Sequence, residues 1–261
     1  MWHSKITLDK LFFINYSLSM DFFKNPQKLK QLLEMSEELP LAVQNYPSRG
    51  QTSIQKLYQT KYGKLFLKKV SDRNHQECRI NVKSGTLAER ESWAHQLASA
   101  LGLNTPRMML LDSLTTVQYW LDIPDAHHFI TDQGPLTFDS QNVFECACFD
   151  WLTGQIDRHD ANYLYDFVHQ KIILIDSAHA FLEWDGSLPH YLQIFEASSL
   201  GAVSEKQYVP FLDKIGTVIS KLQELVPLRS IAEQDALHRR AHRLLNIKSI
   251  FDVIKFYRKS L

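Results

Sequence analysis

The chain has 261 residues, of which 44% are hydrophobic and 22% are charged. These fractions are ordinary for a globular protein, and they exclude a disordered chain, a collagen-like chain and a long coiled coil. Lys plus Arg number 29 and Asp plus Glu also number 29, so the formal net charge is zero. A whole-molecule attraction to nucleic acid or to an anionic membrane is therefore not expected, and only local charged patches could attract such partners.

The cysteines and the apolar segments predict a reduced, soluble, cytoplasmic protein. Cys78, Cys146 and Cys148 are too few, and odd in number, for a disulfide framework, and their spacing does not match a zinc site. Asn15 interrupts the apolar run at 11–14, and no small-residue cleavage site follows, so a secretory signal is not expected. No apolar run reaches the ~18 residues that a membrane-spanning helix needs.

Residues 1–44 are predicted to form a helical N-terminal extension. Pro26 suits the first turn of a helix, and Leu29, Leu32 and Leu33 follow it at helical spacing. A loop rich in turn-forming residues then separates this extension from the next segment.

The segment 45–121 is predicted to be a small lobe made of strands and one helix. Alternating or apolar runs predict four strands, at residues 53–59, 65–70, 108–111 and 115–121. Between the two strand pairs, Thr86 and Glu89 have the spacing of a capping box, and the helix that they begin stops at Gly102.

The remaining segment, 122–261, is predicted to be mainly helical. A short apolar hairpin interrupts the helical pattern at 163–165 and 171–175. A small β-rich half followed by a larger helical half predicts an α+β fold of two lobes with a cleft between them.

The residues that carry chemistry lie around this hairpin. Asn162 follows Asp157 by five positions, and Asp176 comes directly after the second hairpin strand. Phosphoryl transfer from ATP needs a carboxylate that orients the attacking hydroxyl and oxygen ligands for a divalent ion. An acidic residue at the end of an apolar strand would also be costly to bury without a cation. Two acids and an amide in this order therefore predict phosphoryl transfer.

The run from Asp157 to Asn162, Asp-Arg-His-Asp-Ala-Asn, followed by Ile175-Asp176, resembles the catalytic and metal-binding loops of atypical kinases. Similar loops occur in phosphatidylinositol 3- and 4-kinases, in actin-fragmin kinase and in HipA-type kinases. The resemblance covers about residues 50–181 and implies a two-lobed protein kinase-like fold that binds ATP with Mg²⁺ or Mn²⁺. It implies Asp157 as the catalytic base, and Asn162 and Asp176 as the metal ligands.

The same resemblance implies a lysine on a small-lobe strand, paired with a glutamate on the following helix. Lys68 and Glu91 are the candidates for this pair. Lys69 remains an alternative to Lys68, since a shift of one residue moves a side chain to the other face of a sheet. Glu89 remains an alternative to Glu91, although the capping box gives Glu89 a structural role.

Two further segments are implied to contact the nucleotide. Trp120 and Leu121 would offer backbone groups to adenine at the hinge between the lobes. A short polar loop would cover the phosphates, although it lacks the G-x-G-x-x-G pattern of ordinary protein kinases; its residues are Gly50, Gln51, Thr52 and Ser53.

The neighbours of the predicted catalytic residues are expected to shape the site. Arg158 would brace the loop or an acidic segment, and His159 would support the loop or contact a transition-state phosphate. Ser177-Ala178 stands where ordinary protein kinases have Phe-Gly, so a switch that depends on Phe-Gly is not expected. His179 and Phe181 resemble the residues that follow the metal-binding aspartate in lipid kinases.

A dense basic cluster lies at residues 238–243, inside a predicted helix. A solvated helix face is the first interpretation of this cluster. A site for a phosphorylated metabolite, an inositol phosphate or a lipid head group is the alternative.

The sequence therefore predicts an ATP-dependent phosphotransferase, and an atypical protein Ser/Thr kinase is the preferred interpretation. A phosphoinositide kinase is the first alternative, and a nucleotide-binding pseudokinase that serves as an interaction module is the second. A kinase-like fold is also compatible with transfer of AMP or glutamate. The small size resembles that of kinase-like effectors that bacteria deliver into host cells, so such delivery stays an open alternative.

Overall fold

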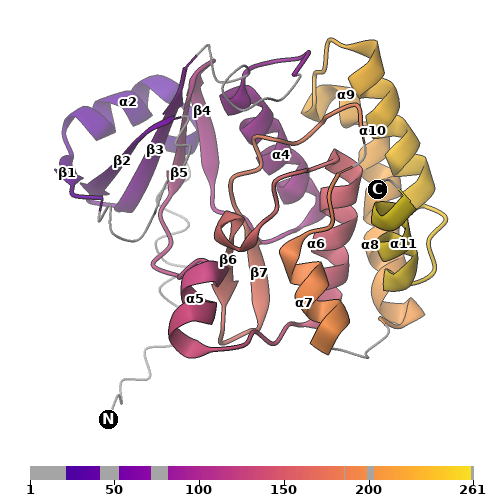
Figure 1. The fold of residues 1–261 in the computed structure, drawn as a ribbon. Coiled ribbons are helices and arrows are strands. Elements are labelled where there is room, and N and C mark those ends of the chain that lie inside the picture. Colours follow the sequence, from indigo (N-terminus) through magenta and orange to yellow (C-terminus); the bar gives the residue numbers. More distant parts are fainter. Residues whose placement is uncertain (1–21, 42–52, 72–81, 185, 199–202, 260–261) are drawn as a thin grey trace.

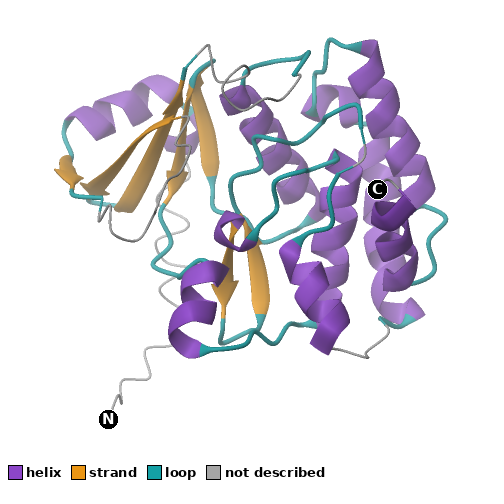
Figure 2. Ribbon diagram, viewed as in Figure 1, coloured by secondary structure: helices purple, strands orange, loops and turns teal. Residues whose placement is uncertain are grey.

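The computed structural model describes residues 22–41, 53–71, 82–184, 186–198 and 203–259 (Figure 1). One part is a sheet with its covering helices, and the other is a set of helices with a hairpin (Figure 2). The sheet part comprises η1 (Phe22–Lys24), α2 (Pro26–Glu34), β1 (Glu37–Leu39), β2 (Ser53–Thr60), β3 (Gly63–Val70), α4 (Leu87–Leu101), β4 (Met108–Asp112) and β5 (Thr115–Tyr119). The helical part comprises α5 (Ala126–Gln133), α6 (Ser140–Thr153), η3 (Asp160–Asn162), β6 (Tyr163–Asp166), β7 (Lys171–Leu174), α7 (His190–Ser198), α8 (Glu205–Ile219), α9 (Leu222–Leu225), α10 (Ile231–Leu244) and α11 (Ile250–Lys259). This arrangement confirms the predicted α+β class, with a small part built on a sheet and a larger, mainly helical part.

Five antiparallel strands form the sheet, in the order β1-β2-β3-β5-β4. β2 and β3 make a tight hairpin that closes where Thr60 pairs with Gly63. Gly63 has a φ of 115°, a conformation that favours glycine. On its other side β3 pairs with β5. β3 is therefore the central strand, and pairing on both sides fixes its side-chain directions.

Two helices cover the two faces of this sheet. α2 packs Leu29, Leu32 and Leu33 against Leu65 of β3 and Val117 of β5, and all five side chains are buried. α4 lies on the opposite face, where it contacts β3, β4 and β5 (Figure 1). Side chains along each strand therefore point alternately toward α2 and toward α4.

Helix α4 begins and ends with the signals that the sequence predicts. Thr86 and Glu89 form a capping box: Thr86 Oγ1 accepts from Glu89 N at 3.1 Å, and Glu89 Oε2 accepts from Thr86 N at 2.8 Å. Gly102 closes the helix with a φ of 77°. Farther along α4, His95 Nε2 accepts a hydrogen bond from Met108 N at 3.3 Å, and burial lowers the pKa of His95 to about 4. A neutral His95 thus connects α4 to β4.

Helix α6 lies at the centre of the helical part, where it contacts α7, α8, α10 and α11. Trp151 near its end is fully buried and lies 5.2 Å from the ring of Phe256 and 5.3 Å from that of Tyr257, between ring centroids. Cys146 and Cys148 are free thiols inside this core, as predicted, and burial raises the pKa of both well above the ordinary value. These thiols therefore serve as small apolar side chains.

The N-terminal extension differs from the all-helical prediction. α2 ends at Glu34, and residues 37–39 form the edge strand β1, in which Leu39 pairs with Leu57 of β2. A three-residue strand is too short to show a period in the sequence, and the hydrogen-bonding edge of β2 decides its conformation. Among the described residues, no helix has both the length and the apolar character needed to cross a membrane. The lobe boundaries at 44/45 and 121/122 stay predictions.

Candidate active site

Lys68 lies on β3 and points to the face of the sheet that α4 covers. Its neighbour Leu67 packs on the α2 side, and Val70, two residues later, packs with Leu87 of α4. Because side chains alternate along a strand, Lys68 shares a face with Val70, whereas the exposed Lys69 shares the other face with Leu67. The register therefore places Lys68, and not Lys69, between the sheet and α4.

Lys68 joins two acids that come from different parts of the chain. Its Nζ lies 2.5 Å from Oδ1 of Asp176 and 3.4 Å from Oε2 of Glu91. Glu91 lies on α4 and is only 3% exposed, whereas Glu89, two residues earlier, is engaged in the capping box. Lys68 thus contacts both the predicted glutamate and the predicted metal-binding acid.

The charges of these three groups depend on one another. Burial by itself lowers the pKa of Lys68, but the carboxylates of Asp176 and Glu91 outweigh it, and the net shift is upward. For Asp176, desolvation raises the pKa, but Lys68, His179 and Arg158 together lower it by more, so the net shift is downward. For Glu91, burial raises the pKa by more than Lys68 lowers it. At neutral pH Lys68 and Asp176 are therefore a charged pair. Of the two acids, Glu91 is the one that is protonated more easily.

Asp157 and Asn162 lie together in the loop between α6 and β6. Asn162 Nδ2 donates to the backbone oxygen of Asp157 at 2.7 Å and to its Oδ2 at 3.3 Å. Two imidazoles flank the same carboxylate: His179 Nδ1 lies 3.2 Å from Oδ2, and His159 Nε2 lies 3.8 Å from Oδ1. His159 also accepts the backbone N–H of Ala161 at 3.3 Å, which stabilises the η3 turn. Asp157 itself is 42% exposed, so an acceptor can approach it.

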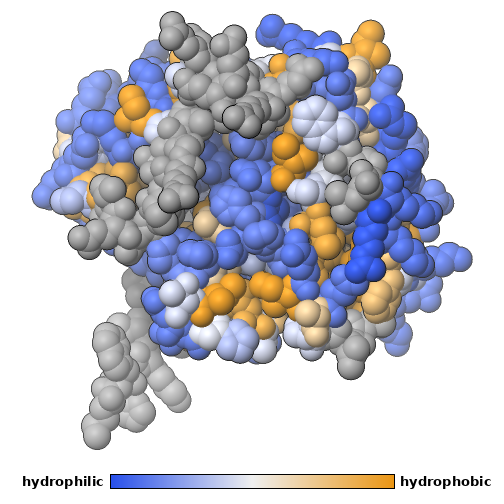
Figure 3. Space-filling view, viewed as in Figure 1, coloured by the Kyte–Doolittle hydropathy of each residue, from blue (hydrophilic) through white to orange (hydrophobic). Residues whose placement is uncertain are grey.

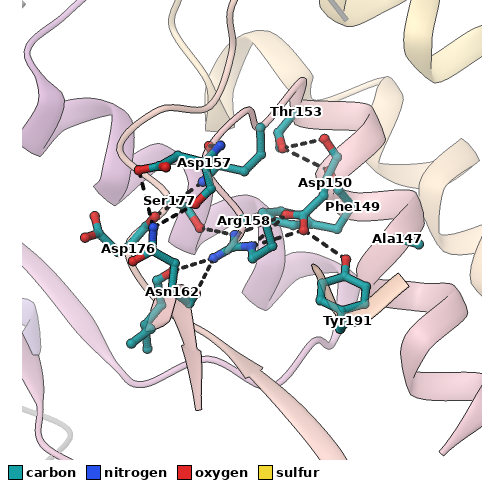
Figure 4. A network of polar contacts seen from close by, with 12 residues as sticks. Ala147, Phe149, Asp150, Thr153, Asp157, Arg158, Asn162, Asp176, Ser177 and Tyr191 are labelled. Atoms are coloured by element: carbon teal, nitrogen blue, oxygen red, sulfur yellow. Dashed lines mark hydrogen bonds and ion pairs between the residues drawn. The ribbon is translucent and has the colours of Figure 1, made fainter. Parts of the chain in front are cut away.

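Arg158 is the buried centre of a polar network that positions this loop (Figure 4). Its Nε donates to Asp150 Oδ2 of α6 at 3.0 Å, and Tyr191 of α7 donates its hydroxyl to the same oxygen at 2.9 Å. Its Nη1 donates to the backbone oxygen of Asn162 at 2.6 Å, and its Nη2 donates to Ser177 Oγ at 2.8 Å. One guanidinium therefore connects α6 to both segments that carry the predicted metal ligands.

Gln155 is a part of the site that the sequence does not reveal. Its side chain is completely buried, and its Oε1 accepts the backbone N–H of Ile156 at 3.0 Å and that of Asp157 at 3.4 Å. Its Nε2 donates to the backbone oxygen of Asp176 at 3.3 Å. Gln155 thus joins the start of the Asp157 loop to Asp176. A glutamine just after a helix gives no such indication in the sequence, because Asp176 lies 21 positions further along the chain.

The segment after β7 has two residues in an unusual backbone conformation. Asp176 has a φ of 47° and Phe181 a φ of 63°, the left-handed region that non-glycine residues seldom adopt. Buried partners hold both: Gln155 binds the oxygen of Asp176, and the N–H of Phe181 donates to the oxygen of Thr153 at 2.5 Å. Strain of this kind is typical of functional sites, where the surrounding structure compensates for it.

The oxygen atoms near Asp176 fit a divalent ion of the kind that nucleotides carry. Among the described residues, no group of three or more His, Cys, Asp or Glu side chains could hold a metal ion on its own. A magnesium site that serves phosphoryl transfer needs only one or two protein oxygens, since phosphate and water supply the rest. The carboxylate of Asp176 and Oδ1 of Asn162, whose Nδ2 is engaged with Asp157, are the atoms that suit this role.

The structure describes only part of the segments predicted to contact the nucleotide. Gly50, Gln51 and Thr52 lie outside the described residues, and Ser53 is the first residue of β2. The backbone N–H of Trp120 donates to the oxygen of Lys64 at 3.0 Å, so it is not available to adenine. A contact with adenine at the hinge would therefore use the oxygen of Trp120 or the backbone of Leu121, and this contact stays a prediction.

The basic cluster at 238–243 is not a uniform surface. Arg240 is 1% exposed, and its three nitrogens donate to backbone oxygens at 3.0–3.1 Å, those of Leu152, Leu182 and Trp184. Arg240 therefore lies in the core of the helical part, and neither a solvated face nor a phosphate site describes it. The periodic pattern of the helix could not show this, because the three carbonyls come from other segments.

Comparisons with known proteins add a likeness in shape. No protein-family model matches the chain, and no curated protein matches it in sequence. Among solved structures, the Helicobacter pylori proinflammatory kinase CtkA is similar with a TM-score of 0.45 and 11% identity, over 86% of this chain and 97% of that one. The open conformation of CtTel1 gives a TM-score of 0.45 and 11% identity over 99% of this chain, which spans only 15% of that protein. At these values the functional argument rests on the residues of the site alone.

Proposed function

We propose that this protein is an ATP-dependent phosphotransferase that acts as an atypical protein Ser/Thr kinase. The observation that carries the proposal is the position of Lys68, which contacts Glu91 of α4 at 3.4 Å and Asp176 of the helical part at 2.5 Å. Catalysis of phosphoryl transfer consists largely of positioning and charge stabilisation, and a lysine fixed by a glutamate beside a metal-binding acid supplies both.

Each polar group of the site has one role in this reaction. Lys68, oriented by Glu91, binds the α- and β-phosphates of ATP, and its present partner Asp176 then turns to the metal side. Asp176 and Asn162 hold Mg²⁺ or Mn²⁺, which when bound neutralises charge on the phosphates. The acceptor oxygen forms a bond to the γ-phosphorus, the bond from this phosphorus to the β–γ bridging oxygen breaks, and ADP leaves. Asp157 orients the acceptor hydroxyl and accepts its proton.

The surroundings of Asp157 suit an acceptor that comes from solution. The carboxylate is 42% exposed, and hydrophilic residues cover the middle of the face shown in Figure 3, between the sheet and the helices. A phosphoinositide kinase is the second candidate, and the observation that favours it is His179, which follows Asp176 and lies 3.2 Å from Asp157 Oδ2. Against it, residues 182–202 contain no Lys or Arg that could bind an anionic head group.

Intact-mass spectrometry tests the proposed function. After incubation with ATP and Mg²⁺ or Mn²⁺, we expect the chain itself or proteins of a cell lysate to carry new phosphate on Ser or Thr. Phosphoinositide vesicles incubated in the same way are expected to gain no phosphate. Lys68→Met is expected to abolish the gain, and the neighbouring Lys69→Met, on the exposed face, to retain it. A gain of AMP, phosphorylation of the vesicles alone, or nucleotide binding with no product in any arm would contradict the proposal.

A further inference from the structure

Arg90 occupies the turn of α4 that also carries Glu91, and it is completely buried. Consecutive residues of a helix point about 100° apart, so the two side chains leave the helix in different directions. Glu91 reaches Lys68 on the sheet. Arg90 reaches the helical part, where its guanidinium lies 5.9 Å from the ring centroid of Phe181.

The guanidinium of Arg90 donates four hydrogen bonds to partners from three segments. Its Nε donates to the backbone oxygen of Ala180 at 2.9 Å, and its Nη2 donates to the same oxygen. Its Nη1 donates to the oxygen of Ser84 at 2.9 Å and to Oε1 of Glu233 on α10 at 3.1 Å. Ala180 follows Asp176 by four residues, so Arg90 binds the very segment that presents the metal-binding acid.

The partners of Arg90 are themselves held in place. Oε1 of Glu233 also accepts the backbone N–H of Lys83 at 3.1 Å. Ser84 Oγ accepts the backbone N–H groups of Arg229 at 2.9 Å and Ser230 at 2.8 Å, just before α10 begins. The entry to α4 and the start of α10 therefore form one buried polar junction with Arg90 in it. Only a planar guanidinium with several donors matches these acceptors at once, and a lysine does not.

We propose that Arg90 is a positioning residue that fixes α4, and with it Glu91 and Lys68, relative to Asp176. This inference rests on the proposed function, since it explains how the lysine from the sheet and the acid from the helical part keep their geometry. Without Arg90, α4 loses its connection to Ala180, and the Lys68–Glu91 pair is free to shift against Asp176. A displacement of the order of 1 Å at such a site reduces the rate strongly.

Arg240 offers a matched control for this role. It is a second buried arginine that donates to backbone oxygens, and its partner Leu182 belongs to the same segment as Ala180. Arg240 itself lies on α10, and none of its partners Leu152, Leu182 and Trp184 lies on α4, so this control leaves the connection between α4 and that segment intact. We expect Arg90→Met and Arg240→Met both to lower the melting temperature. At a temperature where both variants are folded, we expect kcat to fall about tenfold or more for Arg90→Met and to change less than about twofold for Arg240→Met.

A double variant separates positioning from stability. Arg90→Met leaves Glu233 as a buried charge without its cation, and Arg90→Met/Glu233→Met removes that charge as well. We expect the double variant to regain melting temperature while kcat stays low. Recovery of kcat together with stability, or an equal loss of kcat in Arg240→Met, would show that Arg90 has a structural role only and would overturn the inference.

A labelling experiment decides the same question without enzymatic turnover, so failure of the proposed function and failure of this inference are distinguishable. The rate at which an amine-reactive acylating reagent modifies Lys68 is measured by mass spectrometry, with the exposed Lys69 as internal reference. We expect Lys68 to react about threefold faster or more in Arg90→Met, because a shift of α4 would open the space around a lysine that is only 9% exposed in the wild type. An unchanged Lys68 rate in Arg90→Met, or an equal rise in Arg240→Met, would overturn the inference whether or not the wild-type chain transfers phosphate.

Discussion

Replacement of Asp157 by Asn is expected to reduce the rate of phosphoryl transfer by about 10²–10⁴-fold, the range of a general base. The amide has the size of the carboxylate but cannot accept the proton of the acceptor hydroxyl. The loop should keep its shape, because Asn162 Nδ2 donates mainly to the backbone oxygen of residue 157, at 2.7 Å. The measurement is the initial rate with ATP and Mg²⁺, together with the affinity for the nucleotide, which we expect to be unchanged.

Asp160→Asn is the matched control for this variant. Asp160 lies three residues later in the same loop, and its Oδ2 contacts His127 Nδ1 at 3.1 Å and has no part in the proposed reaction. We expect its transfer rate to stay within about twofold of the wild type, since exposed ion pairs contribute little. Equal rates for wild type and Asp157→Asn would exclude Asp157 as the base.

Replacement of Arg158 by Met is expected to have the largest effect on stability. The variant leaves Asp150 as a buried carboxylate with only the Tyr191 hydroxyl at 2.9 Å, and it removes the donor of the Asn162 oxygen. Removal of one partner of a buried ion pair costs about 3–5 kcal/mol. Urea denaturation monitored by circular dichroism gives the free energy of unfolding, and we expect a loss of this size or a chain that does not fold.

Arg258→Met serves as the comparison for Arg158. Arg258 pairs with Glu196 at the surface, at 2.5 Å, with 59% of its side chain exposed. An exposed ion pair is worth less than about 1 kcal/mol, so the free energy of unfolding should change little. If the free energy of unfolding fell by a similar amount in the two variants, the buried network around Arg158 would stabilise the fold no more than an exposed ion pair does.

The elements and their order could be predicted because their signals are local. The capping box of Thr86 and Glu89 and the helical spacing of Leu29, Leu32 and Leu33 each lie within a few residues. The sequence left Lys68 and Lys69 as alternatives because a strand has two equivalent faces. The choice required the position of α2, which covers one face and so identifies the other.

The contacts that hold the site together could not be predicted, because their partners lie far apart in the chain. Arg90 binds Ala180 and Glu233, which are 90 and 143 positions away, and Arg158 binds Asp150 through a geometry that no spacing rule indicates. Buried arginines look like surface arginines in a sequence, since Arg240 stands in a run of basic residues and is nevertheless 1% exposed. The sequence thus indicated the groups proposed for the reaction and a bracing role for Arg158, but it did not indicate the contacts of Arg90 and Gln155.

A crystal structure with Mn²⁺ and a non-hydrolysable ATP analogue tests most directly whether Lys68, Asn162 and Asp176 surround the same nucleotide and its metal ion. We expect anomalous density for Mn²⁺ within about 2 Å of an Asp176 carboxylate oxygen and of Asn162 Oδ1. Lys68 Nζ should then have moved from Asp176 to the α- and β-phosphates, with Glu91 still beside it. A nucleotide bound elsewhere, or a metal ion that touches neither Asp176 nor Asn162, would contradict the proposed site.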